Sequence, residues 1–155
     1  MSGGVDSSVA AALLRGAGFD VVGVHIKCYN LDGCGEKDAE DARRAAETLN
    51  MPFYIFDFEQ EYKDRVVKYM IDGYQRGETP NPDVMCNQEI KFGLFFNKAI
   101  AMGANYVATG HYARAKNGKL YQAKDDTKDQ SYFLWTLKSE QIKRLLFPVG
   151  DLIKR

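Results

Sequence analysis

The sequence lacks a long hydrophobic run and is poor in the residues that mark secreted or fibrous proteins. Its 155 residues include three cysteines, four prolines and one tryptophan. A small, odd number of cysteines argues against a disulfide scaffold and favours free or reactive thiols. No apolar stretch approaches the roughly 20 residues that cross a bilayer, and no basic, hydrophobic leader opens the sequence. We therefore expect a cytoplasmic protein with no membrane partner.

Charge is balanced overall but unevenly distributed. The formal net charge is zero, which by itself gives a nucleic acid no reason to bind. Residues 1–110 carry 11 Lys and Arg against 16 Asp and Glu, whereas residues 111–155 carry 10 against 5. A phosphate backbone would prefer the second segment, although a solvated basic face is the simpler explanation of the charge alone.

Hydrophobic periodicity alternates between helix and strand along the first 110 residues. It predicts helices at 5–15, 37–49, 59–75 and 88–102, strands at 19–26, 52–58 and 105–109, and a long loop at 76–87. Such alternation is typical of a parallel sheet with helices on both faces, so the predicted fold class is α/β.

The pattern changes after residue 112. Asn117 and Gly118 predict a hairpin between residues 113–115 and 119–123. Residues 138–146 predict a short helix with Ser139 as its N-cap. We therefore divide the chain into residues 1–112 and residues 113–155.

A glycine-rich turn opens the first predicted helix: Ser2, Gly3, Gly4, Val5, Asp6, Ser7 and Ser8. Two glycines let the backbone approach an anion, which the free N–H groups of the helix start would hold. Asp6 would hold a Mg²⁺ ion that bridges phosphates. The turn is not a Walker A loop, because no Gly-Lys-Ser/Thr follows. A plain Gly-Gly turn with Asp6 or Ser7 as N-cap is the structural alternative.

A second stretch, Thr79-Pro80-Asn81-Pro82-Asp83-Val84-Met85-Cys86-Asn87, combines two prolines with a cysteine. The prolines stiffen the loop, and Asn81 and Asp83 can bond the backbone or a base edge. Cys86 would lie just before a helix, whose positive end would lower the pKa of its thiol. A small buried cysteine in a turn is the alternative.

These stretches resemble two known patterns. The glycine-rich turn is similar to the pyrophosphate loop of the N-type ATP pyrophosphatases, which have a Rossmann-like fold of the adenine nucleotide alpha hydrolase type. The cysteine stretch, continued by Glu89, Ile90, Lys91 and Phe92, resembles the active-site loop of the tRNA-specific 2-thiouridylases. Residues 108–112, 128–133 and 147–150 agree with that family in order and spacing, so the resemblance covers essentially the whole chain.

The resemblance implies roles for individual residues. It implies an ATP site at Met1, Ser2, Gly3, Gly4, Val5, Asp6, Ser7, Ser8, Ile26 and Gly110. Cys86 would be the catalytic nucleophile with Asp83 beside it, and Asn81, Pro82 and Asp83 would contact the target base. His111, Lys128, Asp129 and Gln130 would contact tRNA. Taken alone, His111 is equally a hydrogen-bonded core histidine, and residues 128–130 a solvated turn.

The implied reaction is ATP-dependent 2-thiolation of the wobble uridine in the tRNAs for Lys, Glu and Gln. Adenylation would turn the uridine oxygen into a leaving group that departs with AMP. A persulfide received from a donor protein would then attack the activated carbon, and a second thiol would release the sulfur. The wobble base must also leave its stack to reach the site.

The sequence departs from the family's pattern in two ways. No strand precedes the phosphate loop, and the family's persulfide-carrying cysteine and later domains, including a small β-barrel, are not among these residues. We therefore expect an N-terminal fragment that is poorly folded or weakly active alone. Cys28 and Cys34 suggest a metal hypothesis, in which they and Cys86 would supply three thiolates to an iron–sulfur cluster. Two incidental thiols are the favoured explanation.

Two rival functions remain open. An ATP-pyrophosphatase ligase acting on a small molecule would need no reactive thiol, so dependence on Cys86 separates it from the tRNA enzyme. A non-catalytic fragment that binds nucleotide or tRNA would bind without forming product.

Overall fold

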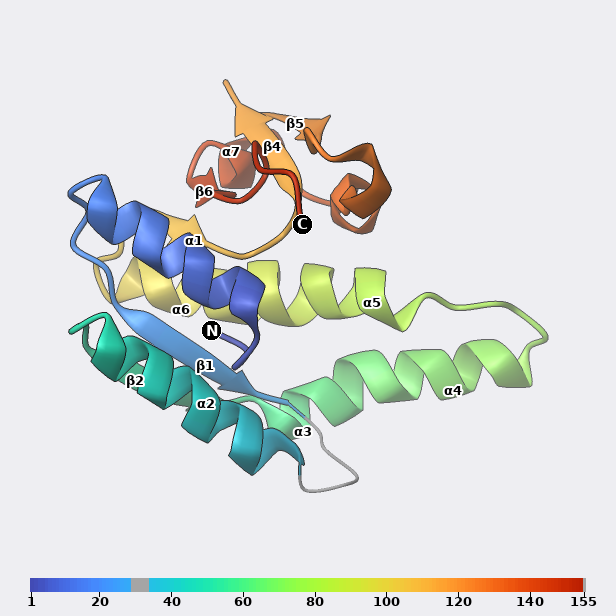
Figure 1. The fold of residues 1–155 in the computed structure, drawn as a ribbon. Helices are drawn as coiled ribbons and strands as arrows, with labels where there is room; N and C mark the ends of the chain where they lie inside the picture. The colour runs from blue at the N-terminus through green and yellow to red at the C-terminus, as the bar shows by residue number, and fades with distance from the viewer. Residues whose placement is uncertain (29–33, 155) are drawn as a thin grey trace.

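The computed structural model describes residues 1–28 and 34–154 (Figure 1). Its elements are, in chain order, α1 (Val5–Gly16), β1 (Gly23–Lys27), α2 (Cys34–Thr48), β2 (Phe53–Asp57), α3 (Glu59–Tyr62), η1 (Lys63–Val67), α4 (Lys68–Gln75), α5 (Pro82–Met85), η2 (Cys86–Phe95), α6 (Phe96–Ala101), β3 (Val107–Ala108), β4 (Ala113–Lys116), β5 (Lys119–Gln122), η3 (Asp126–Lys128), η4 (Ser131–Leu134), α7 (Ser139–Ile142) and β6 (Leu145–Leu146). The segments η1 and η2 are π-helical, and η3 and η4 are 3₁₀ turns. None of the described helices has the length and apolar character needed to cross a membrane.

Parallel strand pairs confirm the predicted α/β class. β1 pairs with β2 from Gly23 opposite Phe53 to Lys27 opposite Asp57, and β3 pairs in parallel with β6. The strand predicted at residues 19–26 begins later, because the ladder starts with the bond from the Gly23 N–H to the Pro52 carbonyl, 2.8 Å. The strand expected before the phosphate loop stays a prediction.

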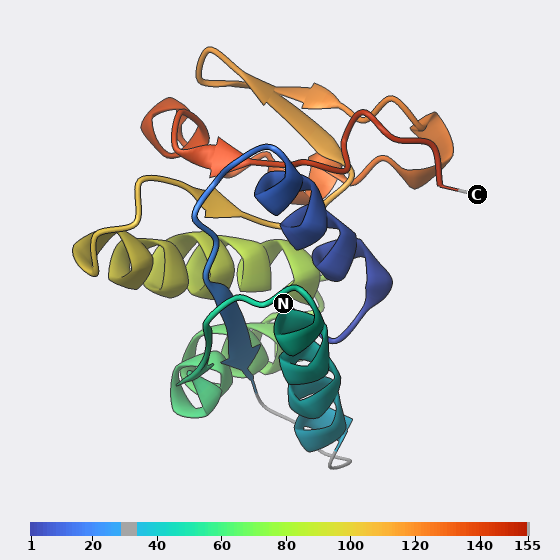
Figure 2. The same cartoon turned by 60° about the vertical axis from the view of Figure 1, so that its left-hand side comes forward.

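Helices cover both faces of the β1–β2 pair (Figure 2). Successive strand residues point to opposite faces, and apolar side chains point to each of them. On one face Phe53 packs in a cluster with Ala11 of α1 and Ala46 of α2. On the other face Phe56 packs with Val66 of η1 and Ile90 of η2.

Two long helices lie side by side beneath this second face (Figure 1). One runs unbroken from α3 through η1 to α4, and the other from α5 through η2 to α6. The loop predicted at residues 76–87 was therefore too long, since the second helix begins at Pro82. A proline is favourable in the first turn of a helix, where its missing N–H costs nothing.

The C-terminal part contains one confirmed prediction and one wrong one. β4 and β5 form the predicted hairpin, with positive φ at Asn117 (53°) and Gly118 (71°). The helix predicted at residues 138–146 ends at Ile142, and its N-cap is Lys138 instead of Ser139. Leu145 and Leu146 instead form β6, which pairs with β3, and Leu145 is only 3% exposed.

The segment after residue 112 shares its core with the rest of the chain. Tyr112, Ala123 and Val149 pack against Ala10 of α1, so α1 lies between the β1–β2 pair and the hairpin (Figures 1 and 2). A second cluster joins Phe92 of η2 to Leu134 and Phe147. The division into residues 1–112 and 113–155 stays a prediction.

Candidate functional site

The glycine-rich turn is shaped by its own hydroxyl groups. The Ser7 hydroxyl accepts a hydrogen bond from the Ser2 N–H at 3.1 Å and donates one to the Gly4 carbonyl at 3.1 Å. Gly4 is the N-cap of α1 and provides no side-chain cap, so the first N–H groups of this helix have no side-chain hydrogen-bond partner among the described residues. Gly3 has a φ of 80°, and a Cβ there would lie 2.6 Å from the Asp38 carbonyl oxygen. Only glycine fits that position.

The turn is braced by a segment from far along the sequence. A Cβ on Gly110 would lie 2.7 Å from both the Asp6 carbonyl carbon and the Ser7 nitrogen. The backbone at residue 110 therefore lies directly on the loop. The structure brings together these predicted ATP-binding positions.

Two other predicted ATP-binding residues lie along β1. The Met1 nitrogen donates to the Val24 carbonyl, and the Met1 carbonyl lies 3.0 Å from Nδ1 of His25, which is 6% exposed. Ile26 packs against the buried cluster of Phe56, Phe58, Val66 and Ile90, called here the Phe56 cluster. Cys28 and Cys86 pack against the same cluster. Ile26 is therefore placed with the thiols.

The carboxylate of Asp6 already has a cationic partner. Both of its oxygens lie 2.8 Å from the Lys154 ammonium nitrogen, and the Tyr112 hydroxyl lies 3.5 Å from Oδ1. Within residues 1–28 and 34–154, no three His, Cys, Asp or Glu side chains converge as metal ligands. A Mg²⁺ ion at Asp6 would need most of its ligands from phosphates and water, which is its usual preference.

Cys86 lies inside a helix, which corrects the prediction that it would lie just before one. Asn81 is the N-cap, and its Oδ1 accepts bonds from the N–H groups of Asp83 and Val84, both at 3.1 Å. Cys86 begins η2, one turn further on. The prolines had suggested an extended loop, but Pro82 begins a helix that Asn81 caps.

The nearest chemical partner of Cys86 is another cysteine. Cys28 follows the end of β1, and its thiol donates a hydrogen bond to Cys86. That bond lowers the pKa of Cys86 to about 7, with a further contribution from Lys91 and against the effect of burial. The same bond, with burial, raises the pKa of Cys28. Cys86 is therefore the thiol that ionises first.

Lys91 is a functional candidate that the sequence did not single out. It is half-buried, and no ion pair or hydrogen bond engages its ammonium group within the described chain. Its charge acts on Cys28, Cys86 and His111. Cys86 and Lys91 are five residues apart in η2. In an α-helix, side chains five residues apart point ~140° away from each other. A π-helix repeats through i→i+5 bonds, which brings such side chains closer to the same side. The π-helical η2 could not be foreseen from a 3.6-residue period.

The residues proposed to meet the base have mixed roles. The side-chain oxygen of Asn81, Oδ1, caps the helix, whereas its side-chain nitrogen, Nδ2, has no hydrogen-bond partner among the described residues. Asp83 is exposed, and its charge raises the pKa of Cys86. Asn87, next to Cys86, is 4% exposed, and its Oδ1 has no hydrogen-bond partner among the described residues.

His111 has the geometry of a core histidine. Its ring lies 5.9 Å from the Phe92 ring and 6.3 Å from the Phe147 ring, and Nδ1 lies 2.8 Å from Thr109 Oγ1. Burial, together with Lys91, lowers the pKa of His111 to about 3. The imidazole is therefore neutral at physiological pH, and its contact with tRNA stays a prediction.

Two of the next three predicted tRNA contacts hold the fold together. The Asp129 carboxylate accepts bonds from the Ala123 N–H at 2.8 Å and the Ser131 hydroxyl at 2.7 Å. The Gln130 Oε1 accepts a bond from the Tyr112 N–H at 3.0 Å. Lys128 is exposed and forms no ion pair within the described residues. Lys128 is therefore the one of the three whose charged group is open to a ligand.

The structure describes the side chains of two of the three cysteines in the iron–sulfur hypothesis. Cys28 and Cys86 are in contact and free of disulfides. Cys34 begins α2, but its side chain lies outside the described residues.

Comparison with known proteins places these features in a family. The family model described as the tRNA methyl transferase HUP domain matches residues 1–155. The tRNA-specific 2-thiouridylase MnmA of Mycobacterium ulcerans is 49% identical over 163 residues, covering 99% of this chain and 45% of the relative. The proteins of the same name from Mycolicibacterium smegmatis (50% identity, 99% and 46% covered) and Mycobacterium tuberculosis (49%, 100% and 45%) agree.

The chain thus spans a little under half the length of these relatives. The glycine-rich turn, the strand ends and the Cys86 helix all lie within the matched residues. On this match over its whole length, the chain belongs to the tRNA methyl transferase HUP domain family.

Proposed function

We propose that the chain is the ATP-binding, thiol-bearing part of an enzyme that replaces the 2-oxygen of the tRNA wobble uridine with sulfur. The observation that carries the proposal is the packing of Cys86 against Cys28 in the Phe56 cluster, where the hydrogen bond from Cys28 lowers the pKa of Cys86 to about 7. A thiol with this pKa is substantially ionised at neutral pH and can act as a nucleophile. The names of the similar proteins from mycobacteria support this reaction.

The position of the thiols supports a shared site with a nucleotide. Cys28 directly follows the carboxyl end of β1, and Gly110 lies two residues after that of β3. Ligands of open α/β sheets bind outside these strand ends. The N–H groups at the start of α1 would hold phosphates, and the ATP would supply the AMP leaving group for the uridine oxygen. A Mg²⁺ ion bound to those phosphates would compete with Lys154 for Asp6.

The residues of this chain would divide the remaining work. Cys86 would supply a thiolate, while Cys28 and Lys91 would keep it ionised. Asn81, Pro82 and Asp83 would face the target base, and Lys128 would contact the phosphate backbone. A persulfide donor protein would deliver the sulfur, and the tRNAs for Lys, Glu and Gln are the proposed substrates.

Thiolation of unmodified tRNA by the full-length protein tests the proposal. Wild type, Cys86→Ser and Cys28→Ser are incubated with ATP, Mg²⁺ and a persulfide donor, and thiolated tRNA is detected by its retardation on a mercury-containing gel. We expect product from wild type and from Cys28→Ser, which keeps a hydrogen-bond donor, and none from Cys86→Ser.

Three other outcomes would contradict the proposal. Thiolation by Cys86→Ser at the wild-type rate removes the role of the thiol. Formation of AMP without modified tRNA supports a small-molecule ligase. In a parallel reaction with a methyl donor added, a methylated uridine in place of a thiolated one would support the reaction in the family's description instead.

A further inference from the structure

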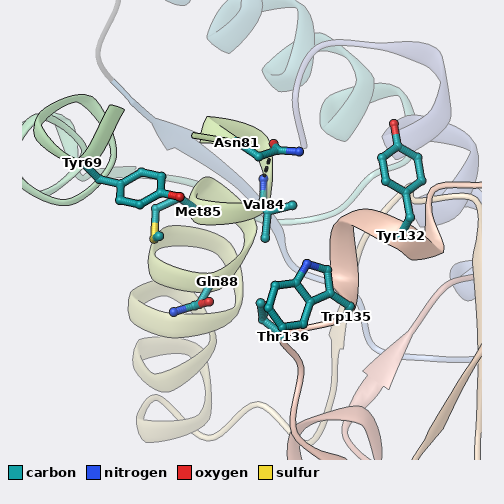
Figure 3. Close-up of a pocket in the computed structure, with 8 residues that line it drawn as sticks. All are labelled: Tyr69, Asn81, Val84, Met85, Gln88, Tyr132, Trp135 and Thr136. Carbon is teal, nitrogen blue, oxygen red and sulfur yellow. Dashed lines mark hydrogen bonds between the residues drawn. The ribbon is translucent and has the colours of Figure 1, made fainter. Parts of the chain in front are cut away.

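A groove lies beside the Cys86 helix, between α5 with the start of η2 and the turn η4 (Figure 3). Its volume is about 410 Å³, and its lining includes Tyr69, Asn81, Gln88, Tyr132, Trp135 and Thr136. A second hollow of about 420 Å³ shares Gln88, Trp135 and Thr136 with the first and continues to Lys138 and Gln141. The two hollows form one groove, with Trp135 in its middle.

The aromatic rings on the C-terminal wall of this groove are unusually exposed. Trp135 is 73% exposed and Tyr132 is 58% exposed. Figure 3 shows the Trp135 indole next to Thr136 and facing the helix that carries Val84 and Gln88. An aromatic side chain exposed to solvent contributes little to the stability of the fold, but its flat face can stack against a planar ligand.

The polar groups of the groove suit the edges of a nucleobase. The Thr136 hydroxyl oxygen is buried and has no hydrogen-bond partner in the described part of the chain. Asn81, which would face the target base, also lines the first hollow, so the groove would begin beside that base. Donors and acceptors beside an aromatic face are how proteins hold unstacked bases of single-stranded RNA.

The charge of the groove suits RNA. None of the described residues that line the two hollows is acidic. Lys138 lines the second hollow, is exposed and forms no ion pair within the described chain. A positive charge at the end of a stacking surface is typical of grooves that follow a nucleic-acid backbone.

We propose that this groove binds an unpaired nucleotide of the RNA substrate, with its base stacked on Trp135. The nucleotide is a neighbour of the target uridine, because Cys86 does not line the groove and packs instead against the Phe56 cluster. The identity of the RNA rests on the proposed function. The groove itself rests on Trp135, Tyr132, Thr136 and Lys138.

Binding of a fluorescently labelled RNA hairpin with an unpaired loop tests this proposal in the full-length protein. We expect Trp135→Ala to weaken binding between about fivefold and a hundredfold, the range for losing one stacked base. Trp135→Phe, which keeps a ring, should retain most of the affinity. Tyr74→Ala removes an aromatic ring that is 57% exposed outside the groove, and it should change nothing.

The fluorescence of Trp135 gives a second readout, obtained as the difference between wild type and Trp135→Phe. We expect the looped hairpin to quench this signal and a fully paired RNA of equal length to leave it unchanged. Equal quenching by a mononucleotide would overturn the proposal in favour of a free-nucleotide site. Quenching by a hydrophobic peptide but not by RNA would indicate a protein partner and would also overturn it.

The thiolation assay separates failure of the groove from failure of the proposed function. If wild type and Trp135→Ala thiolate tRNA and bind the hairpin equally well, the groove proposal is wrong and the function stands. If the looped RNA binds and quenches Trp135 but no tRNA is thiolated, the groove stands and the reaction is wrong. If no RNA binds, the groove proposal is wrong as well.

Discussion

At the scale of single residues, the chemistry centres on two thiols and one lysine. Cys86 owes its low pKa first to the hydrogen bond from Cys28 and then to Lys91, while burial opposes both. The two contributions that lower the pKa come from the side chains of Cys28 and Lys91, which can be replaced separately. The contributions can therefore be measured one at a time.

Replacing Cys28 with alanine removes the thiol that donates to Cys86. We expect the pKa of Cys86 to rise from about 7 towards the ordinary value of 9.0, because the thiolate loses its stabilising bond. The measurement is the rate of Cys86 alkylation against pH, followed by peptide mass spectrometry. Cys28→Ser keeps a donor and should show a midpoint near that of wild type; an unchanged midpoint in the alanine variant would refute the assignment.

Replacing Lys91 with methionine should move two pKa values in the same direction. A cation favours a thiolate and disfavours an imidazolium ion, so its loss raises the pKa of both Cys86 and His111. Alkylation reports on Cys86, and NMR titration of the ring protons reports on His111. Lys68→Met, at an exposed lysine of α4, is the control; a shift at only one group would contradict the placement of Lys91.

His111 makes the free energy of unfolding depend on pH. Its pKa is lowered to about 3 in the fold from about 6.5 in the unfolded chain. Between those values the unfolded state binds more protons, so stability rises with pH there and this contribution is complete above about 6.5. The free energy of unfolding should therefore fall as the pH drops below 6.5. In His111→Gln this part of the slope should disappear, as urea titrations at several pH values would reveal.

At the scale of elements, the helix carrying Cys86 depends on its first residue. Asn81→Ala removes the cap that holds the N–H groups of Asp83 and Val84, and should lower the free energy of unfolding by about 1 kcal/mol. Asn81→Asp keeps the acceptor and should keep the stability. Urea denaturation of both variants measures the difference, and equal loss in both would show that the cap is not the cause.

Periodicity predicted the elements whose pattern is local and regular. The parallel strands followed from apolar runs between helices, and the hairpin from Asn117 and Gly118. The start of the Cys86 helix was missed because Pro82 suits both a loop and a first helical turn. The strand at Leu145 and Leu146 was missed because two leucines at the end of a helical pattern carry no period of their own. Their partner β3 lies nearly 40 positions earlier.

At the scale of the whole molecule, the site depends on contacts that no local pattern contains. The resemblance implied that Gly110 and the glycine-rich turn share an ATP site, and the fold places the backbone of Gly110 against that turn. The sequence brought Cys28 and Cys86 together only in the hypothesis of a three-cysteine cluster, and the exposure of Trp135 had no sequence signal. Each depends on how distant elements pack.

Gly110→Ala tests the contact with the glycine-rich turn. The added Cβ would lie 2.7 Å from backbone atoms of Asp6 and Ser7, which cannot move aside without reshaping the turn. We expect the ATP affinity measured by calorimetry to fall at least tenfold if the turn holds phosphate. Gly16→Ala, where a Cβ meets nothing within 4 Å, is the control and should bind ATP normally. Unchanged affinity in Gly110→Ala would place the nucleotide elsewhere.

The ion pair between Asp6 and Lys154 joins residues 148 positions apart. On a ribosome, Asp6 leaves the exit tunnel 148 residues before Lys154. At roughly 5–20 residues per second, the glycine-rich turn waits about 7 to 30 s for that partner. Assembly of this turn therefore runs against the direction of synthesis: its residues are made long before Lys154 but reach their final contacts only after it.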